Sequence, residues 1–330
     1  MTAVTFPTCP TEKSVDPELP FVSVIIPVRN DARRLAVCLR SLSELDYAAN
    51  RMEVIVVDNG SRDDSAEVAR AAGAKVLLHP DLRVGALRNR GVEAARGEIL
   101  ALVDSDHEVP QGWLRAGVND LVADPDLHMV GAPYLPPPQG TWVQRIWAMH
   151  RLRHPERGEV VWLASGNLFV RKRDFNRIGG FDETLVAAED VDLCVRLKAV
   201  QGRIVSDMRL ANIHHGEPPT LWQFFRKELW RGSSGIRAFL AHGMPLHELP
   251  SLAFPIYHLL ALALLGATAI AVALGASWLW LVVALGLLVL PAVLLGLKTS
   301  WQARQPLAMP QLAVLYLTYG LARTAALFKR

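Results

Sequence analysis

Two pairs of acidic residues have the type and spacing needed to bind a cation and to move a proton. Asp104 and Asp106 are separated by one serine and follow an apolar run, while Glu189 and Asp190 are adjacent and open a predicted helix. Carboxylate oxygens suit Mg²⁺ or Mn²⁺, and a positioned carboxylate can act as a general base. Turn formation and helix N-capping explain such acids equally well when each pair is taken alone.

Two adjacent histidines offer a further ligand. His214 and His215 precede a Gly-Glu-Pro turn, and one of them could complete a metal shell begun by Asp106. Loop histidines are more often simply exposed. The three cysteines lack metal-ligand or CxxC spacing, so we expect buried or neutral thiols at Cys9, Cys38 and Cys194.

Short apolar runs alternate with helical stretches through the first hundred residues. The expected strands are 22–26, 53–57, 75–78 and 98–103, with a helix at 85–95. Such alternation predicts a parallel sheet covered on both faces, with ligands bound at the carboxyl ends of the strands. Asp104 and Asp106 directly follow the strand expected at 98–103. No GxGxxG follows the first strand, which argues against a dinucleotide site.

The end of the chain is expected to lie in a membrane. The 330 residues are 51% hydrophobic with a mean hydropathy of +0.20, and 249–297 contain no Asp, Glu, Lys or Arg. Two spans are predicted, at 251–274 and 277–297, which excludes a wholly cytosolic enzyme. A third stretch, 307–328, is interrupted by Pro310 and Arg323. It is therefore expected to be interfacial or re-entrant, with a third span as the alternative.

Charge and composition limit the possible partners and mark the segments outside the sheet. The net charge is +3, and five basic residues with no acid follow residue 297, so nucleic acid is not an expected partner. Residues 1–20 are expected to be a flexible arm and 133–140 a stiff non-helical connector. Segments 142–154 and 221–231 are rich in Trp, Phe and Arg. For both, core packing and the membrane interface remain open.

Taken in order, these motifs resemble the family 2 glycosyltransferases. The resemblance covers about residues 21–235 and rests on VSVIIPVRN, VVDNGSRDDS, GALRNRG, GEILALVDSD, SGNLFVRK, GGFDE and the Glu189-Asp190 pair. It implies the GT-A fold, an α/β domain with a Rossmann-like mixed sheet and helices on both faces, followed by C-terminal transmembrane helices. The implied domains are a catalytic domain at 21–248, divided into a nucleotide-sugar half (21–132) and an acceptor half (133–248), and a membrane region at 249–330.

The resemblance also implies roles for individual residues. Asp190 corresponds to the acceptor base, with Glu189 beside it. A Mg²⁺ or Mn²⁺ ion would be held by Asp104, Asp106 and His214, His215 being the less favoured histidine. The residues expected to bind the nucleotide-sugar are Pro27, Arg29, Asp58, Arg88, Asp104, Gly166 and Asn167.

The implied activity is that of an inverting, metal-dependent transferase. It would move a sugar from a nucleotide-diphospho-sugar to a lipid-linked or membrane glycan acceptor in cell-envelope glycan synthesis. Membrane lipids are expected partners, and the location is a bacterial inner membrane with the catalytic domain in the cytoplasm. Processive members have Q-x-x-R-W, whereas here Gln223 to Arg226 is followed by Lys227, so single transfers are expected. The alternatives are a processive polysaccharide synthase, an inactive sugar-nucleotide-binding scaffold and a nucleotidyltransferase.

Overall fold

The computed structural model describes residues 19–149, 156–241 and 249–329, with side chains described outside 233–252. Residues 1–18 of the expected N-terminal arm lie outside this description. Contacts divide the chain into two compact units. The first unit comprises 1–138 and 154–216, and the second comprises 139–153 and 217–330.

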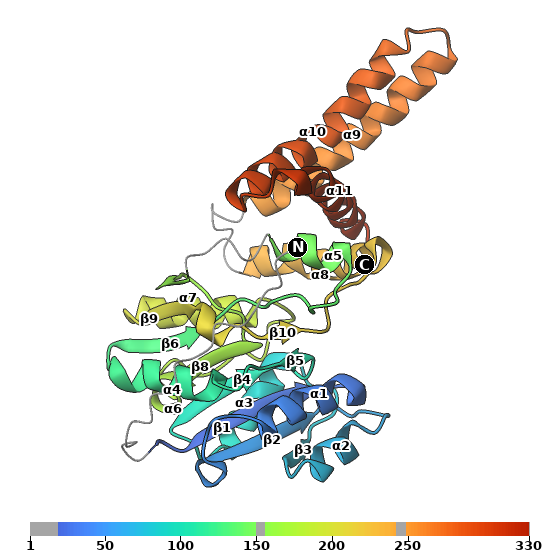
Figure 1. The fold of residues 1–330 in the computed structure, drawn as a ribbon. Helices are drawn as coiled ribbons and strands as arrows, with labels where there is room; N and C mark the ends of the chain where they lie inside the picture. The colour runs from blue at the N-terminus through green and yellow to red at the C-terminus, as the bar shows by residue number, and fades with distance from the viewer. Residues whose placement is uncertain (1–18, 150–155, 242–248, 330) are drawn as a thin grey trace. The chain divides into compact units, whose positions relative to one another are not determined.

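The first unit is built on an eight-stranded mixed sheet (Figure 1). β1 pairs in parallel with β2 and β4, and β2 pairs in parallel with β3, as the alternation of strands and helices predicts. β8 is antiparallel to both of its neighbours, β4 and β6. In sheet order the strands are β3 (Lys75–Leu78), β2 (Met52–Asp58), β1 (Val22–Val28), β4 (Ile99–Val103), β8 (Asn167–Arg171), β6 (Leu127–Gly131), β9 (Arg203–Asp207) and β7 (Arg157–Glu159).

Helices cover both faces of this sheet because successive strand side chains point to opposite sides. Val24 and Ile26 of β1 pack into one core cluster, and Ile25 packs into the other. The first cluster includes residues of α1 (Ala32–Ser43), α2 (Ser65–Ala71) and α4 (Trp113–Ala123). The second includes residues of α3 (Val84–Ala94), α6 (Lys172–Arg177) and α7 (Glu189–Ala199).

One edge of the sheet collects the residues expected to do chemistry. β1, β2 and β4 end there, and the antiparallel β8 begins there, with Val103 opposite Asn167. Beside it lies a small antiparallel ribbon of β5 (His107–Glu108) and β10 (Ile213–His214). Two 3₁₀ turns complete the unit, η1 (Ala49–Arg51) and η2 (Met208–Leu210).

The second unit is helical. Its elements are α5 (Trp142–Ala148), α8 (Leu221–Ala241), α9 (Leu249–Ala273), α10 (Leu279–Gln302), η4 (Pro306–Ala308) and α11 (Met309–Ala326). Among the described residues, Ala253–Ala273 and Leu279–Gln302 are the two helical segments long and apolar enough to cross a membrane. They match the predicted spans to within a few residues, except that α10 continues through Lys298 to Gln302.

Aromatic packing explains why the second unit begins before residue 248, the predicted domain boundary. Trp147 of α5 contacts Phe224 of α8 and Tyr316 of α11, with ring centroids 4.7 and 5.8 Å apart. Trp147 and Phe224 are buried, whereas Trp222 and Trp230 are exposed. The two aromatic segments therefore combine core packing on one face with an exposed face. Residues 150–154 of the first segment lie outside the described residues.

An ion pair joins α8 to α11. Glu228, which is 1% exposed, accepts hydrogen bonds from Arg231 at 2.8 Å and from Arg323 at 2.9 Å. The Arg323 guanidinium also lies over the Tyr319 ring. Arg323, the residue that argues against a third span, thus has a carboxylate partner on α8.

Candidate active site

The β5–β10 ribbon brings together a carboxylate and two imidazoles. His107 is paired with His214 across the ribbon, and Asp106 immediately precedes β5. The His214 Nε2 lies 3.0 Å from Asp106 Oδ2, and the His107 Nε2 lies 3.7 Å from Asp106 Oδ1. One ligand atom from each residue falls within 4.8 Å of the other two. His215 instead contacts Glu108 at 2.8 Å, so the structure places His214 at this cluster.

A glycine allows this cluster to close. A Cβ added to Gly216 would overlap Asp106 Oδ2 and approach His214 Nε2 to 2.9 Å. The turn that follows β10 can therefore pass against the carboxylate only without a side chain. The Gly-Glu-Pro motif after the histidines thus has a local steric reason.

His107 is the residue that sequence reasoning missed. Its side chain is 1% exposed, and neither ring nitrogen has a hydrogen-bond partner of normal geometry among the described residues. Burial, reinforced by His214, lowers the pKa of His107 to about 4. A neutral, buried imidazole beside a carboxylate is the state in which histidine binds a metal. The available signal was its position directly after Asp104-Ser105-Asp106.

The charge of Asp106 is stabilised despite its surroundings. Burial alone would raise the pKa of this carboxyl group, but the His214 hydrogen bond, with further help from His107 and Arg34, holds the pKa well below its usual range. An ionised carboxylate and two imidazoles fit a divalent first-row ion. The orphaned nitrogens of His107 are the observation that supports this fit.

Arg88 links the two acidic pairs. This side chain is buried, and it donates to Asp104 Oδ1 at 2.6 Å and to Glu189 Oε1 at 2.9 Å. The two carboxylates hold the pKa of Arg88 above its ordinary value although burial acts against it. One guanidinium therefore fixes the D-x-D loop relative to the start of α7. The predicted contact of Arg88 with the nucleotide stays a prediction.

Asp190 has the properties of a base poised near neutral pH. It lies in the first turn of α7, after Ala188 in the left-handed region (φ 63°), and its Oδ1 accepts from the Val191 N–H at 2.9 Å. Burial and the neighbouring Glu189 raise the pKa of Asp190 to about 6, while Arg88 acts in the opposite direction. Ala188 occupies the N-cap position, so neither acid is the N-cap residue, although Asp190 accepts from an N–H of the first turn.

The predicted nucleotide residues lie at the same sheet edge, at the ends of β1 and β2. Pro27 is buried within β1. Arg29 is exposed, 4.0 Å from Asp81. Asp58 is 2% exposed, and its Oδ1 accepts from the Ser61 N–H at 2.7 Å. The Asp58 carboxylate therefore stabilises the turn after β2, and its contact with the nucleotide-sugar remains a prediction.

Gly166 and Asn167, although adjacent, have different roles in the structure. A Cβ on Gly166 would overlap Asp104 Oδ2, so this glycine allows close approach at the site. Asn167 is fully buried and bonded to Trp113 Nε1 at 2.8 Å and to the Ala132 and Leu210 carbonyls. Its amide already holds strands and loops together, which counts against the predicted contact of Asn167 with the donor.

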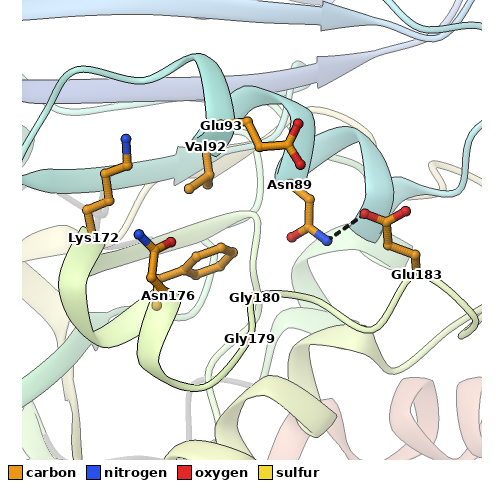
Figure 2. A pocket seen from close by; sticks show the side chains of 9 residues that line it. Asn89, Val92, Glu93, Lys172, Asn176, Gly179, Gly180 and Glu183 are labelled. Atoms are coloured by element: carbon orange, nitrogen blue, oxygen red, sulfur yellow. Dashed lines mark hydrogen bonds between the residues drawn. The ribbon is translucent and has the colours of Figure 1, made fainter.

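A hollow of about 590 Å³ lies between α3 and α6 (Figure 2). Two of its polar side chains, Asn89 and Lys172, already make hydrogen bonds within the protein. Asn89 donates to Glu183 at 3.0 Å, as drawn in Figure 2, and also bonds both the N–H and the carbonyl of Phe181. Lys172 donates to the Ala95 carbonyl. Asn89 thus fixes the GGFDE turn that precedes α7, and the hollow contains none of the predicted site residues.

Comparisons with known proteins agree with this arrangement. Residues 23–179 match the family described as Glycosyl transferase family 2. Glycosyltransferase AglE of Haloferax volcanii is 30% identical over 71% of this chain and 79% of its own length. The pre-mycofactocin glycosyltransferase of Mycobacterium tuberculosis is 30% identical over 67% of this chain, which spans about half of that protein (48%).

A solved structure extends the likeness to the fold. The mannosyltransferase PcManGT from Pyrobaculum calidifontis, in complex with GDP-Man and Mn²⁺, superposes with a TM-score of 0.58 at 21% identity, covering 94% of this chain and 86% of that one. The mixed sheet is therefore a GT-A sheet. With the family match and the relatives, this makes the enzyme class plain: the chain belongs to the family 2 glycosyltransferases, which transfer sugars from sugar-nucleotides.

Proposed function

We propose that this protein is an inverting, metal-dependent glycosyltransferase that makes single transfers to a lipid-linked or membrane glycan acceptor in cell-envelope glycan synthesis. The observation that supports it most directly is Arg88, which contacts Asp104 at 2.6 Å and Glu189 at 2.9 Å. Through Arg88, Asp104 on the donor side and the Glu189-Asp190 pair on the acceptor side belong to one site.

Asp190 is proposed as the general base. Its raised pKa leaves it largely ionised at neutral pH and still basic enough to take a proton from an acceptor hydroxyl. The acceptor oxygen would then attack the anomeric carbon opposite the departing nucleoside diphosphate, and one such displacement inverts the configuration. Glu189, held by Arg88, orients the start of α7 and raises the basicity of its neighbour.

The cation would be held by Asp106, His107 and His214, with Asp104 at its edge. When bound, a Mn²⁺ or Mg²⁺ ion would offset the charge of the leaving diphosphate. Two imidazoles in the donor set favour Mn²⁺ over Mg²⁺, because nitrogen is a poorer ligand for the harder ion. PcManGT, whose structure contains Mn²⁺ and GDP-Man, provides a precedent on the same fold.

The second unit supports the choice of acceptor and location. Its two candidate spans would keep the catalytic unit at a membrane surface. Basic residues before and after the spans favour a cytoplasmic site at a bacterial inner membrane, where nucleotide-sugars are available. Lys227, where the processive motif has tryptophan, contacts Glu217 at 3.6 Å and supports single transfers.

The decisive experiment incubates membranes containing the protein with labelled UDP-, GDP- and dTDP-sugars and Mn²⁺, then extracts lipids into organic solvent. We expect label from one donor in the lipid fraction, with one sugar added per acceptor and inverted configuration by NMR. Asp190→Asn should reduce transfer by about 10² or more. Asp192→Asn is the matched control, because this acid in the same helical turn is paired with Arg196.

Other results would contradict specific parts of the proposal. Label confined to soluble glycans would exclude the membrane acceptor, and long products would indicate a processive synthase. Full activity after chelation would exclude a requirement for a metal ion. Donor binding without transfer or hydrolysis in any arm would identify an inactive scaffold.

A further inference from the structure

The turn that leads into α7 is attached at both ends to one face of α3. Gly85, Arg88 and Asn89 are spaced as i, i+3 and i+4, so these positions share one side of that helix. Arg88 donates to Glu189 at 2.9 Å, and Asn89 bonds Phe181 at the start of the turn. The same face of α3 therefore contacts the first and the last residue of the segment that carries the chain into α7.

Asn89 fixes the backbone of Phe181 through both halves of its amide. The Asn89 Nδ2 donates to the Phe181 carbonyl at 2.9 Å, and the Oδ1 accepts from the Phe181 N–H at 3.0 Å. A Cβ on Gly180, whose φ is 67°, would lie 2.9 Å from the same Oδ1, so the amide can come this close only to a glycine. Glu183 is a third partner, at 3.0 Å (Figure 2). The peptide at Phe181 is thus held by a donor and an acceptor from one side chain.

The packing between α3 and this segment is close at both ends. A Cβ on Gly85 would lie 3.2 Å from the Phe181 Cβ and 3.6 Å from the Glu189 Cβ. The Phe181 side chain is buried, and its ring centroid lies 5.6 Å from the guanidinium carbon of Arg88. Since Asp190 directly follows Glu189, a shift of the turn against α3 would move the proposed base.

We propose that Asn89 is a positioning residue for this base: it holds the turn before α7 so that Asp190 meets the acceptor hydroxyl at the right distance and angle. The proposal rests on the function proposed above, in which Asp190 takes the acceptor proton. Asn89 acts through Phe181 and the turn, and a misplacement of about 1 Å at a reacting group can cost about 10²-fold in rate. The metal cluster is built on the β5–β10 ribbon instead. Binding of the cation and the nucleotide should therefore be spared.

The test measures transfer per nucleotide-binding site, so that misfolded protein does not count. Sites are titrated with Mn²⁺ and the nucleoside diphosphate of the donor that labels membranes. Asn89→Ala should lower kcat for transfer about 10- to 100-fold, with KM for the donor unchanged. Asn89→Asp should act in the same direction, because it keeps the shape of the side chain but places an oxygen against the Phe181 carbonyl.

Two controls separate this role from the loss of surface contacts. Asn176→Ala removes an exposed asparagine of α6 that also lines the hollow. Glu183→Ala removes the exposed partner of Asn89 and leaves both bonds to Phe181 in place. Both variants should keep kcat within about twofold of the wild type, because exposed pairs contribute little.

A double variant distinguishes positioning from a general effect on the fold. If Asn89 acts through the base, Asn89→Ala should cause less than about a twofold further loss once Asp190→Asn has removed the base. Losses that multiply in the double variant, or an unchanged kcat per site in both Asn89 variants, would overturn the role of Asn89. Full transfer by Asp190→Asn alone would instead overturn the base itself, so the two proposals fail on different observations.

Discussion

The chemistry proposed for this site depends on two acids whose pKa values are shifted by burial and by neighbouring side chains. Asp106 is kept ionised by His214, while Asp190 is kept close to protonation by burial and Glu189. Two carboxylates in one site thus have pKa values pushed in opposite directions, the arrangement expected when one binds a cation and the other exchanges a proton.

The pH dependence of turnover should report Asp190. Because the pKa of Asp190 is about 6, this proposed base is mostly protonated below that pH. We therefore expect kcat/KM for the acceptor to fall about tenfold per pH unit below 6 and to level off above it. Asp190→Asn should remove this limb from the residual activity. A limb centred near 4 would instead indicate a solvated carboxylate.

The ionised form of Asp190, which is proposed to be active in turnover, should be the less favourable form for stability. The usual pKa of 3.8 applies to the unfolded chain, so the folded state binds the Asp190 proton more tightly. The free energy of unfolding then falls as pH rises from about 4 to 6. Above pH 6, Asp190→Asn should unfold at a higher temperature than the wild type in detergent. Below pH 4 the two should coincide, and a variant less stable at pH 7.5 would show that burial of the ionised Asp190 carboxylate does not destabilise the fold.

The role of His107 can be measured without turnover. Mn²⁺ binding followed by electron paramagnetic resonance should weaken about 10- to 100-fold in His107→Ala. His215→Ala, which removes the partner of Glu108 instead, is the control and should bind Mn²⁺ as the wild type does. Equal affinities for all three proteins would exclude His107 as a ligand.

At the scale of elements, the two-residue ribbon of β5 and β10 shows what the sequence could and could not predict. The strands β1 to β4, the helix α3 and the position of the acids after β4 follow from periodicity. The choice between His214 and His215 does not, because it depends on ribbon register between segments about a hundred residues apart. The inward direction of Arg88 and the burial of Asn167 are likewise tertiary properties. The second unit includes α8 because this helix packs on α11, which helical periodicity alone cannot reveal.

The α8–α11 ion pair predicts a stability pattern. Glu228→Ala leaves Arg323 without its carboxylate in a largely buried position, so a loss of about 3 kcal/mol in the free energy of unfolding is expected. The double variant Glu228→Leu with Arg323→Leu should recover to within about 1 kcal/mol of the wild type. Chemical denaturation in micelles provides the measurement. Additive losses in the double variant would show that the pair does not couple the helices.

The whole molecule joins a sheet-based catalytic unit to a helical unit with two candidate spans. α9 and α10 are separated by a short turn at Gly275, which has a φ of 102°. If this turn faces outward, both flanks and the carboxyl terminus are cytoplasmic. α11 is then interfacial or re-entrant, with Arg323 paired inside the protein.

Reporter fusions test this topology. Alkaline phosphatase inserted at Gly275 should be active, and a fluorescent protein fused after Arg330 should fluoresce. The matched exchange, fluorescent protein at the turn and phosphatase at the terminus, should be silent at both places. Phosphatase activity at the carboxyl terminus would establish a third crossing and overturn the interfacial assignment of α11.

The single guanidinium at the centre of the site has a kinetic consequence. Asp104, Asp106, Glu189 and Asp190 present four carboxylates, and Arg88 compensates only part of their charge. A donor with a negative diphosphate would be repelled by this cluster on its own. In the proposed metal-dependent mechanism the cation would therefore bind before the donor or together with it, and nucleotide-sugar affinity should depend on the concentration of free metal.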